Sequence, residues 1–524
     1  MTEDSMHWAD QTARQIINLK GEKDNYVIES GITPSGMIHI GNFREIITAD
    51  LIQRGFEAIE KKCTFFYIWD SYDVFRKVPV NVPNQEELKK HLHKPVFRVP
   101  DPYNTHKNYA EHFEKEMEDQ LPRVGVNPTF VYQDQKYLNL EFTEEIKQAL
   151  ENTEAIKEIL NEYRKEPLAE SWLPIFVFCE KCHKDTTHDL VYEGDYNISY
   201  ECACNHKDTV DFSKKGIVTL RWRVDWPMRW HKNKVDFESA GKDHFAAGGS
   251  VDTGRKIQEA VWKTQPPHGW VYEWISIKGG KQFSSSAGEV ITLKEMLEIY
   301  EPQIIRHLFA GTRPNTEFAI SFDLDVFKVY EDYDQCERIH YKKEEVAEKD
   351  FLKQKRIYEL SQVDSVAKEM PFQPSLRHMM NVVQLYQGDM EQIKGFYKDD
   401  IKTKEDDQKV EIRAQCALNW LAKHAPEDFK FKVNTKEELK AIEFTDEEKT
   451  IIKALATSLE TAKKDEKALH DSFYVVAEQA EAKPQDLFKA VYKALINKER
   501  GPRLANFILT IGIKEVIELV ESIN

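Results

Sequence analysis

The fold of this chain is decided by one stretch, Ser30-Gly31-Ile32-Thr33-Pro34-Ser35-Gly36-Met37-Ile38-His39-Ile40-Gly41-Asn42. It follows residues 26–29, a β-branched and aromatic run that predicts a strand, and precedes residues 43–56, whose apolar positions recur at helical spacing. A strand, a glycine-rich turn and a helix build the phosphate site at the carboxyl edge of the sheet in α/β folds, because the free N–H groups of the helix bind an anion. Taken alone, the pattern also fits an ordinary turn with a surface histidine.

Size and charge narrow the class of protein. The chain has 524 residues, enough for about two to four domains, and its net charge of −17 excludes a surface coated in basic charge but not a local basic groove. Seven cysteines, four of them clustered, favour a reducing compartment and metal binding over a disulfide framework. Residues 1–13 lack the apolar core of a signal peptide, and there is no apolar run of about 18 residues. We therefore expect a cytoplasmic protein without a membrane partner.

A second strand is predicted at residues 64–69, which are almost continuously apolar, as in a buried parallel strand. It ends in an acidic stretch, residues 70–73, which would lie at the ligand edge of the sheet. The alternative for this stretch is a solvated loop with a helix cap. Strand, helix and strand predict a right-handed βαβ unit, and the pattern that follows predicts helices at 109–121 and 141–160.

The clustered cysteines predict a zinc site. They occur as C-x2-C and, nineteen residues later, C-x-C-x-H, separated by a predicted hairpin. Two such pairs on tight turns can converge as a tetrahedral zinc ribbon, in which no position stays open for a catalytic water; free buried cysteines are the alternative. We expect a structural zinc ion held by Cys179, Cys182, Cys202 and Cys204, with His206 as the alternative fourth ligand.

Residues 207–234 are basic within an acidic chain, with eight Lys and Arg against three Asp and a local charge of +5. Trp222, Trp226 and Trp230 interleave with these charges and could stack on bases, although a tryptophan is more often simply packed. We predict a basic groove for an RNA end in this segment.

Two glycine-rich loops follow. Residues 241–250 lead into a predicted helix at 254–264, and their small side chains suit the close approach of a nucleotide. After a predicted strand at 270–277, the Gly-, Lys- and Ser-rich residues 278–288 could close over a polyphosphate and stabilise charge on a leaving group. A plain helix-entry turn and a polar linker are the alternatives for the two loops.

Several of these stretches resemble the signatures of class I aminoacyl-tRNA synthetases. Residues 39–42 are similar to their His-Ile-Gly-His motif, with Asn42 in the last place. Residues 278–288 are similar to their Lys-Met-Ser-Lys-Ser motif, with Gln282 in the place of the first lysine. The combination looks like the class I lysyl-tRNA synthetases of archaea and some bacteria, and it also includes residues 220–230, 241–244, 252–254 and 498–504.

The resemblance implies an α/β fold with a Rossmann-type parallel sheet in the catalytic domain, a zinc-binding insertion and an all-α anticodon-binding region. Helical patterns beyond residue 330 agree with this, including capping-box spacing at Thr445 and Glu448. The domains expected are the first half of the catalytic domain at 1–130, the insertion at 131–215, the second half at 216–330 and the anticodon-binding region at 331–524.

The resemblance also implies the reaction. Lysine and ATP, with Mg²⁺, would give lysyl-adenylate and pyrophosphate, and the terminal ribose of tRNA(Lys) would accept the lysyl group, in a monomer or weak oligomer. Positioning and charge stabilisation would do this work without an enzyme nucleophile. The implied catalytic residues are His39, Asn42, Lys281, Ser284 and Ser286. The implied ATP contacts are Thr33, Pro34, Ser35, Gly36, Gly41, Gly241, Asp243, Gly248 and Lys278. The implied lysine contacts are Gly31, Thr33, Asp70, Asp225, Trp226, His244, Tyr272 and Glu273, with Glu273, Asp225 or Asp70 as the partner of the ε-ammonium.

Three rival functions stay open. A glutamyl-type class I synthetase would offer an arginine to the carboxylate of its substrate, whereas this chain offers acids. A small-molecule nucleotidyltransferase needs neither a zinc insertion nor a long helical tail. A non-catalytic RNA-binding paralogue is kept open by the altered loop, with Gln282 and Ala287.

Overall fold

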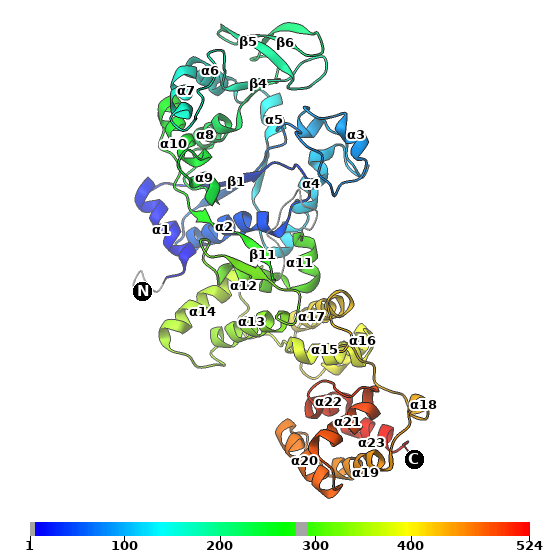
Figure 1. The fold of residues 1–524 in the computed structure, drawn as a ribbon. Helices are drawn as coiled ribbons and strands as arrows, with labels where there is room; N and C mark the ends of the chain where they lie inside the picture. Colours follow the sequence, from blue (N-terminus) through cyan, green and yellow to red (C-terminus); the bar gives the residue numbers. More distant parts are fainter. Residues whose placement is uncertain (1–5, 279–290, 524) are drawn as a thin grey trace. The chain divides into compact units, whose positions relative to one another are not determined.

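The structure is a computed structural model and describes residues 6–278 and 291–523. The chain divides into two compact units (Figure 1). The first contains the parallel sheet and comprises residues 1–297, 302–321 and 336–366; the second, helical in its described residues, comprises residues 298–301, 322–335 and 367–524.

The first unit is built on a parallel sheet, as predicted. Strands β1 (Tyr26–Ile32), β2 (Cys63–Trp69) and β3 (Thr129–Tyr132) pair in this order and all run parallel. Helix α2 (Ile40–Glu57) follows β1, packs on β1 and β2, and begins three residues before the predicted start. Its apolar residues are buried because they cover the sheet.

Segments from later in the sequence lie beside β1 and form two short parallel sheets of their own. Single parallel bridges link Ile28 to Phe237 and Phe237 to His268. Strand β9 (Ala240–Gly241) pairs in parallel with β10 (Val271–Tyr272), and β11 (Ile275–Ile277) with β12 (Phe318–Ile320). The predicted continuous strand at 270–277 is therefore interrupted, and the carboxyl ends of β1, β2 and β9 meet at one edge, where ligands bind in such sheets.

Helices cover this core. Helix α1 (Trp8–Lys20) packs along α2, and the glycine at position 55 permits the close approach, since a Cβ there would lie 2.8 Å from the Ala9 carbonyl oxygen. The predicted helix at 254–264 instead begins at Ser250, as α10. The other helices of this core are α3 (Gln85–Lys89), η2 (Val96–Arg98), α4 (Tyr109–Glu118), η3 (Leu121–Val124), α9 (Lys242–Phe245), α10 (Ser250–Ile257), η4 (Gln258–Trp262), α11 (Leu293–Ile299), α12 (Pro302–Ala310) and α14 (Glu348–Ser361).

The segment between the two halves of the sheet forms helices and small antiparallel sheets. The single helix predicted at 141–160 is wrong: the chain breaks at Asn152 (φ −106°, ψ 22°) between α6 and α7. The predicted hairpin is present and gains a third strand, β7. The elements are α5 (Gln133–Leu138), α6 (Thr143–Glu151), α7 (Thr153–Asn161), β4 (Ile175–Val177), β5 (Thr187–Gly194), β6 (Asn197–Cys202), β7 (Lys207–Asp211), β8 (Val218–Leu220) and α8 (Trp222–Asn233).

The described elements of the second unit are all helices, and one of them, α13 (Val326–His340), is divided between the two units. The predicted capping box is confirmed, because the Thr445 hydroxyl accepts from the Glu448 N–H at 3.1 Å and the Glu448 carboxylate from the Thr445 N–H at 2.9 Å. The helices are α15 (Leu376–Leu385), α16 (Met390–Phe396), α17 (Lys404–Lys423), α18 (Lys436–Leu439), α19 (Asp446–Glu460), α20 (Glu466–Gln479), α21 (Pro484–Ile496), α22 (Leu504–Ile511) and α23 (Ile513–Val520).

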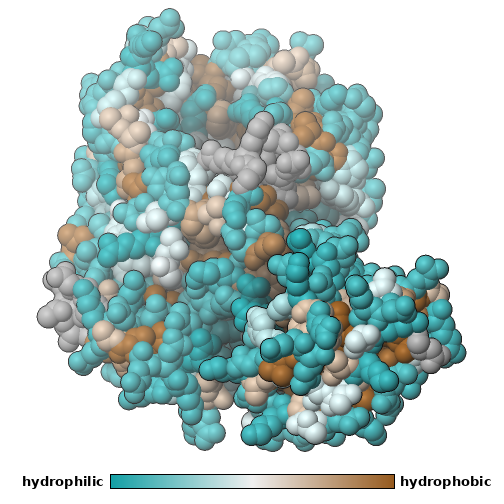
Figure 2. Space-filling model, turned by 60° about the horizontal axis from the view of Figure 1, so that its bottom comes forward, coloured by the Kyte–Doolittle hydropathy of each residue, from teal (hydrophilic) through white to brown (hydrophobic). Residues whose placement is uncertain are grey.

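Within the described residues, no helix is long and apolar enough to cross a membrane. The face shown in Figure 2 is mostly hydrophilic, and its hydrophobic residues are scattered in small patches. Both observations agree with the highly charged composition of the chain.

Candidate active site

The glycine-rich turn after β1 presents the amino end of α2 at the ligand edge of the sheet. His39 is the N-cap residue of the helix, and its N–H donates to the side-chain oxygen of Asn42 at 3.2 Å. Burial lowers the pKa of His39 to about 4, so the imidazole is neutral at pH 7. His39 can therefore contact a phosphate as a hydrogen-bond partner rather than as a cation, while Asn42 holds the end of the helix in place.

The turn itself is braced from both sides. The Thr33 hydroxyl donates to Asp73 at 2.5 Å, and the Ser35 carbonyl accepts from the Tyr109 hydroxyl at 2.9 Å. Gly36 is buried against Pro79, which a Cβ would approach to 3.3 Å. These contacts fix the backbone that faces the amino end of α2.

A small cavity of about 50 Å³ lies beside this turn, at the carboxyl ends of β1, β2 and β9. Four of its residues were predicted as lysine contacts, namely Gly31, Trp226, His244 and Tyr272. The others are Glu45, Ile68, Trp222, Arg229, Glu238, Ser239 and Ala240. The structure thus brings half of the predicted set together and adds two acids that the sequence did not single out.

Glu45 is held on one wall of this cavity. Its carboxylate accepts from the Ser30 hydroxyl at 2.6 Å and from the Tyr272 hydroxyl at 2.7 Å. Burial of the carboxyl group raises the pKa of Glu45 to about 7, against these hydrogen bonds, which lower it. A nearby cation would stabilise the ionised form of this buried carboxyl group. Among the described residues, Glu45 makes no ion pair.

Glu238 also lines the cavity and is buried. It accepts from the indole N–H of Trp230, and burial holds its pKa well above the ordinary value for a glutamate. Burial therefore disfavours the charged form of Glu238, whose carboxyl group contributes a hydrogen-bonding wall to the cavity.

Two predicted acids are already paired. Arg229 is buried, donates to Asp70, and lies 3.4 Å from Asp225 through Nε. The Tyr137 hydroxyl also donates to Asp225. Burial raises the pKa of Asp225 to about 6 and that of Asp70 in the same direction, while the Arg229 guanidinium opposes both shifts. Asp70 and Asp225 thus hold Arg229 in place, rather than standing ready for a substrate cation.

The third predicted acid, Glu273, does not line the cavity. Its carboxylate binds Lys242 at 2.9 Å, and its side chain is 26 % exposed. Asp243, predicted to contact ATP, is exposed on α9, and Gly241 lies against the ring of Tyr272. Lys278 is exposed, whereas Lys281, Ser284 and Ser286 lie outside the described residues.

Arg44 anchors the chain that flanks the predicted phosphate loop. Its buried guanidinium donates to the carbonyls of Trp274 at 3.3 Å, Pro314 at 2.7 Å and Thr316 at 2.7 Å. One arginine of α2 therefore ties β11 and the segment before β12 to the helix of the first motif. An arginine within a helical pattern ordinarily faces solvent, so the sequence did not indicate that Arg44 is buried and binds distant carbonyls.

The four cysteines meet as predicted, whereas His206 does not join them. The sulfurs of Cys179 and Cys204 are 3.6 Å apart, those of Cys182 and Cys202 are 3.7 Å apart, and all four lie within 4.8 Å of one another. Thiolates about 2.3 Å from a tetrahedral zinc ion are separated by such distances, so the cluster fits a closed structural site. A second group that could hold a metal, Asp101 with His106 and His112, was not predicted.

The tryptophans of the basic segment are packed rather than free. Trp226 and Trp230 are buried in a core with Val235, Ala240 and Val251. The rings of Trp222 and Trp226 stack at 4.9 Å. The alternative that a tryptophan is simply packed therefore holds for Trp226 and Trp230, which the i, i+4, i+8 spacing places on one face of α8 together with Trp222.

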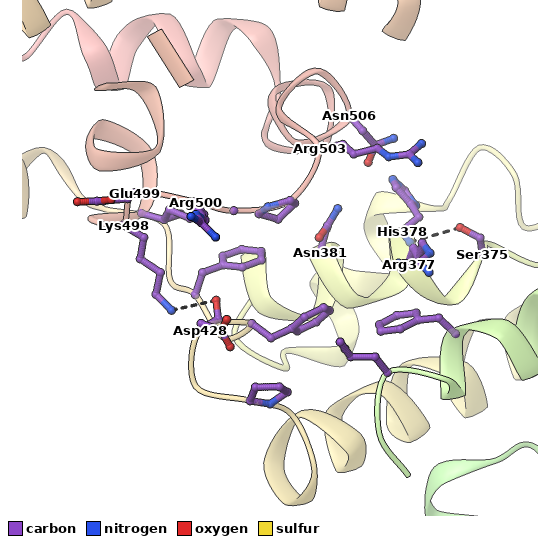
Figure 3. Close-up of a pocket in the computed structure, with 18 of the residues that line it drawn as sticks. Ser375, Arg377, His378, Asn381, Asp428, Lys498, Glu499, Arg500, Arg503 and Asn506 are labelled. Atoms are coloured by element: carbon purple, nitrogen blue, oxygen red, sulfur yellow. Dashed lines mark hydrogen bonds between the residues drawn. The ribbon is translucent and has the colours of Figure 1, made fainter. Parts of the chain in front are cut away.

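The second unit contains a cavity of about 970 Å³ between α13, α15 and the loop from α21 to α22 (Figure 3). Asn381, Arg500 and Arg503 lie on its walls, together with Phe327 and other aromatic rings. Three lysines of this C-terminal region are already engaged: Lys493 binds Glu448, Lys514 lies 3.8 Å from Glu518 and Lys498 donates to backbone carbonyls. Arg500 and Arg503 are exposed and make no ion pair within the described residues.

The comparisons with known proteins identify the family of the chain. A family model described as tRNA synthetases class I (K) matches residues 6–364, and the chain belongs to this family. The relatives include proteins named lysine–tRNA ligase. That of Borrelia garinii is 44 % identical over 98 % of both chains, and that of Thermococcus kodakarensis is 38 % identical over 98 % of this chain and 99 % of the relative. The solved glutamate–tRNA ligase of Elizabethkingia meningosepticum matches 95 % of this chain and 99 % of its own, with 14 % identity and a TM-score of 0.42.

Proposed function

We propose that this chain is a lysine–tRNA ligase whose lysine-binding site is the cavity at Glu45. The enzyme joins lysine to tRNA with ATP, as its relatives' name describes. The carboxylate of lysine attacks the α-phosphorus of ATP, pyrophosphate leaves, and lysyl-adenylate forms. The 3′-terminal ribose hydroxyl then attacks the lysyl carbonyl carbon, the bond to AMP breaks, and the hydroxyl proton passes to solvent.

One observation carries the assignment of the cavity. Glu45 faces the cavity with a pKa near 7 and without an ion-pair partner among the described residues. An ammonium group seated there would keep the carboxylate ionised. Trp226 would lie along the aliphatic stem, and His244 and the Gly31 backbone would lie near the α-amino group.

Phosphate binding is assigned to the amino end of α2. His39 and the glycine-rich turn, with Thr33, Pro34, Ser35, Gly36 and Gly41, would receive the triphosphate, accompanied by Mg²⁺. Lys278, Lys281, Ser284 and Ser286 would act on the leaving pyrophosphate, and Gly241, Asp243 and Gly248 would border the nucleotide. Asn42, which accepts from the His39 N–H, would contact the phosphate region of ATP from the same end of the helix.

The remaining parts of the chain are assigned supporting roles. Zinc held by the four cysteines would keep β5, β6 and β7 folded and supply no catalytic step. Residues 331–524 would bind the anticodon of tRNA(Lys), with Arg500 and Arg503 at the cavity of the second unit. We assign the enzyme to the cytoplasm as a monomer or weak oligomer.

The charge of the cavity disfavours glutamate as the substrate. Arg229 lines the cavity, but Asp70 and Asp225 already neutralise it, so it is not available to a second carboxylate. Charging of tRNA with each amino acid in turn tests the proposal. We expect acid-precipitable lysyl-tRNA alone; charging with glutamate, or with no amino acid, would overturn it.

A further inference from the structure

Asp185 lies between the cysteine cluster and the segment that follows β2 in the first unit. Its side chain is 4 % exposed, and its carboxylate lies 2.7 Å from Arg76 Nη1 and accepts from His93 Nδ1 at 2.9 Å. The Asp185 N–H donates to the His93 carbonyl at 2.9 Å. His93 precedes Asp185 by 92 residues, so these contacts join two distant parts of the chain. Loss of this ion pair would leave a buried carboxylate without its partner, which is costly.

The loops that carry the cysteines fix the position of Asp185. The residue before it, Lys184, accepts through its carbonyl from the Cys179 N–H at 3.0 Å. The residue after it, Thr186, accepts from the N–H of Ala203, which lies between the two cysteines of the second pair, at 3.1 Å. A zinc ion held by the four sulfurs would keep both loops together, and Asp185 with them.

Two short stretches extend from this contact to the ligand edge of the sheet. Residues 73–75 and 93–97 pair in the antiparallel direction through backbone hydrogen bonds of 2.8–3.0 Å. We call this pairing the 73–97 ladder. Arg76 and His93 lie at one end of the ladder, and Asp73 lies at the other. A displacement of the first end therefore reaches the second through a continuous set of hydrogen bonds.

Asp73 holds the glycine-rich turn. Its carboxylate accepts from the Thr33 hydroxyl at 2.5 Å, and Thr33 belongs to the turn that we assign to the triphosphate of ATP. Thr33 is not among the described residues that line the cavity at Glu45. The position of Asp73 should therefore affect the binding of ATP more than the binding of lysine.

We propose that Asp185 is a positioning residue for ATP, which holds the glycine-rich turn in place through the 73–97 ladder and so makes the phosphate site depend on the cysteine cluster. Asp185 touches no substrate and takes no chemical part. The inference rests on the proposed function, because it concerns the same phosphate site. Its physical basis is preorganisation, since a binding group that is held in advance loses less freedom when the substrate arrives.

The test compares Asp185→Asn with Asp211→Asn. Asparagine keeps the shape of Asp185 and removes its charge, which weakens the ion pair. Asp211 is the matched control, because it ends β7 beside the same cysteine cluster and pairs with a lysine three residues later at 2.7 Å. The measurements are zinc content, hydrogen exchange of the backbone N–H groups in the 73–97 ladder, and the KM values for ATP and lysine with kcat, all from ATP–pyrophosphate exchange in the presence of tRNA.

We expect Asp185→Asn to keep its zinc, to exchange the ladder N–H groups faster, and to raise the ATP KM roughly tenfold while the lysine KM and kcat stay within about twofold. Arg76→Ala removes the same ion pair from an arginine whose side chain is 53 % exposed, so it should fold and raise the ATP KM in the same way. Asp211→Asn should match the wild type in each measurement.

Three results would overturn the positioning role of Asp185: an unchanged ATP KM in Asp185→Asn and Arg76→Ala, an equal rise in Asp211→Asn, or loss of zinc from Asp185→Asn, which would show that it acts on the cluster itself. The proposed function is tested separately by the wild type. If the wild-type enzyme catalyses no lysine-dependent exchange, the proposed function fails. If it does and the variants bind ATP normally, only the role of Asp185 fails.

Discussion

Tyr272 donates its hydroxyl to the Glu45 carboxylate over 2.7 Å, across 227 residues of sequence. The contact joins β10, from the second half of the sheet, to α2, which follows β1 in the first half. The two halves of the catalytic unit thus meet at the carboxyl group that we assign to the substrate ammonium.

Replacement of Glu45 tests this assignment. Glu45→Gln keeps the shape and removes the charge, so the buried ammonium loses its partner; we expect the lysine KM to rise roughly 100-fold, about 3 kcal/mol. The matched control is Glu273→Gln, which alters an acid paired with Lys242 outside the cavity. An unchanged lysine KM in Glu45→Gln, or a large rise in the Glu273 variant, would place the ammonium elsewhere.

Lysine binding should depend on pH through Glu45. Because the pKa of Glu45 is raised to about 7, the carboxyl group is protonated below that pH and attracts the ammonium less. We therefore expect the lysine KM to increase as the pH falls from about 8 to about 6. Steady-state kinetics across this range should show the effect in the wild type and its absence in Glu45→Gln.

The same shift has a consequence for stability. The folded chain holds a proton on Glu45 more tightly than the unfolded chain does, because burial raises the pKa of this carboxyl group from its ordinary 4.5 to about 7. The free energy of unfolding is therefore reduced as the pH rises through this window. We expect the Tm of Glu45→Gln to fall less than that of the wild type as the pH rises from about 5 to about 8. Identical dependence of Tm on pH in the two proteins would contradict the raised pKa of Glu45.

Gly31 should be sensitive to a single methyl group. A Cβ at this position would lie 2.6 Å from the Ile68 carbonyl oxygen and 2.8 Å from the Ile68 Cβ, so Gly31→Ala must separate β1 from β2 and alter the cavity wall. We expect a loss of about 1–3 kcal/mol in the free energy of unfolding, measured by urea denaturation, together with a higher lysine KM. Gly395→Ala, where a Cβ meets nothing within 4 Å, serves as the neutral control.

Zinc should depend on the four cysteines and not on His206. Metal analysis of purified protein should find one zinc ion per chain in the wild type and in His206→Ala, and none in Cys182→Ser or Cys204→Ser. Cys63→Ser changes a cysteine outside the cluster and should keep the metal. Loss of zinc from His206→Ala alone would show that the histidine, rather than Cys204, is the fourth ligand.

The sequence predicted what depends on local pattern. Three features depend only on residues close together in sequence, and the structure confirms each of them: the βα turn at residues 30–42, the cysteine pairs and the Thr445 capping box. Ion pairs and hydrogen bonds between residues far apart in the sequence could not be predicted from it. Arg229 meets Asp70 across 159 residues, so Asp70 and Asp225 looked like free acids. Glu45 lies in helix α2, and a glutamate in a helix ordinarily faces solvent, so only its contact with Tyr272 of β10 shows its role.

The central claim is tested most directly by ATP–pyrophosphate exchange on the purified enzyme, with lysine, glutamate and the other amino acids in turn, in the absence and presence of tRNA. We predict that lysine is the only amino acid that supports exchange, and that the lysine KM is roughly 100-fold higher in Glu45→Gln. Exchange driven by glutamate, or no exchange with any amino acid even when tRNA is present, would contradict the account.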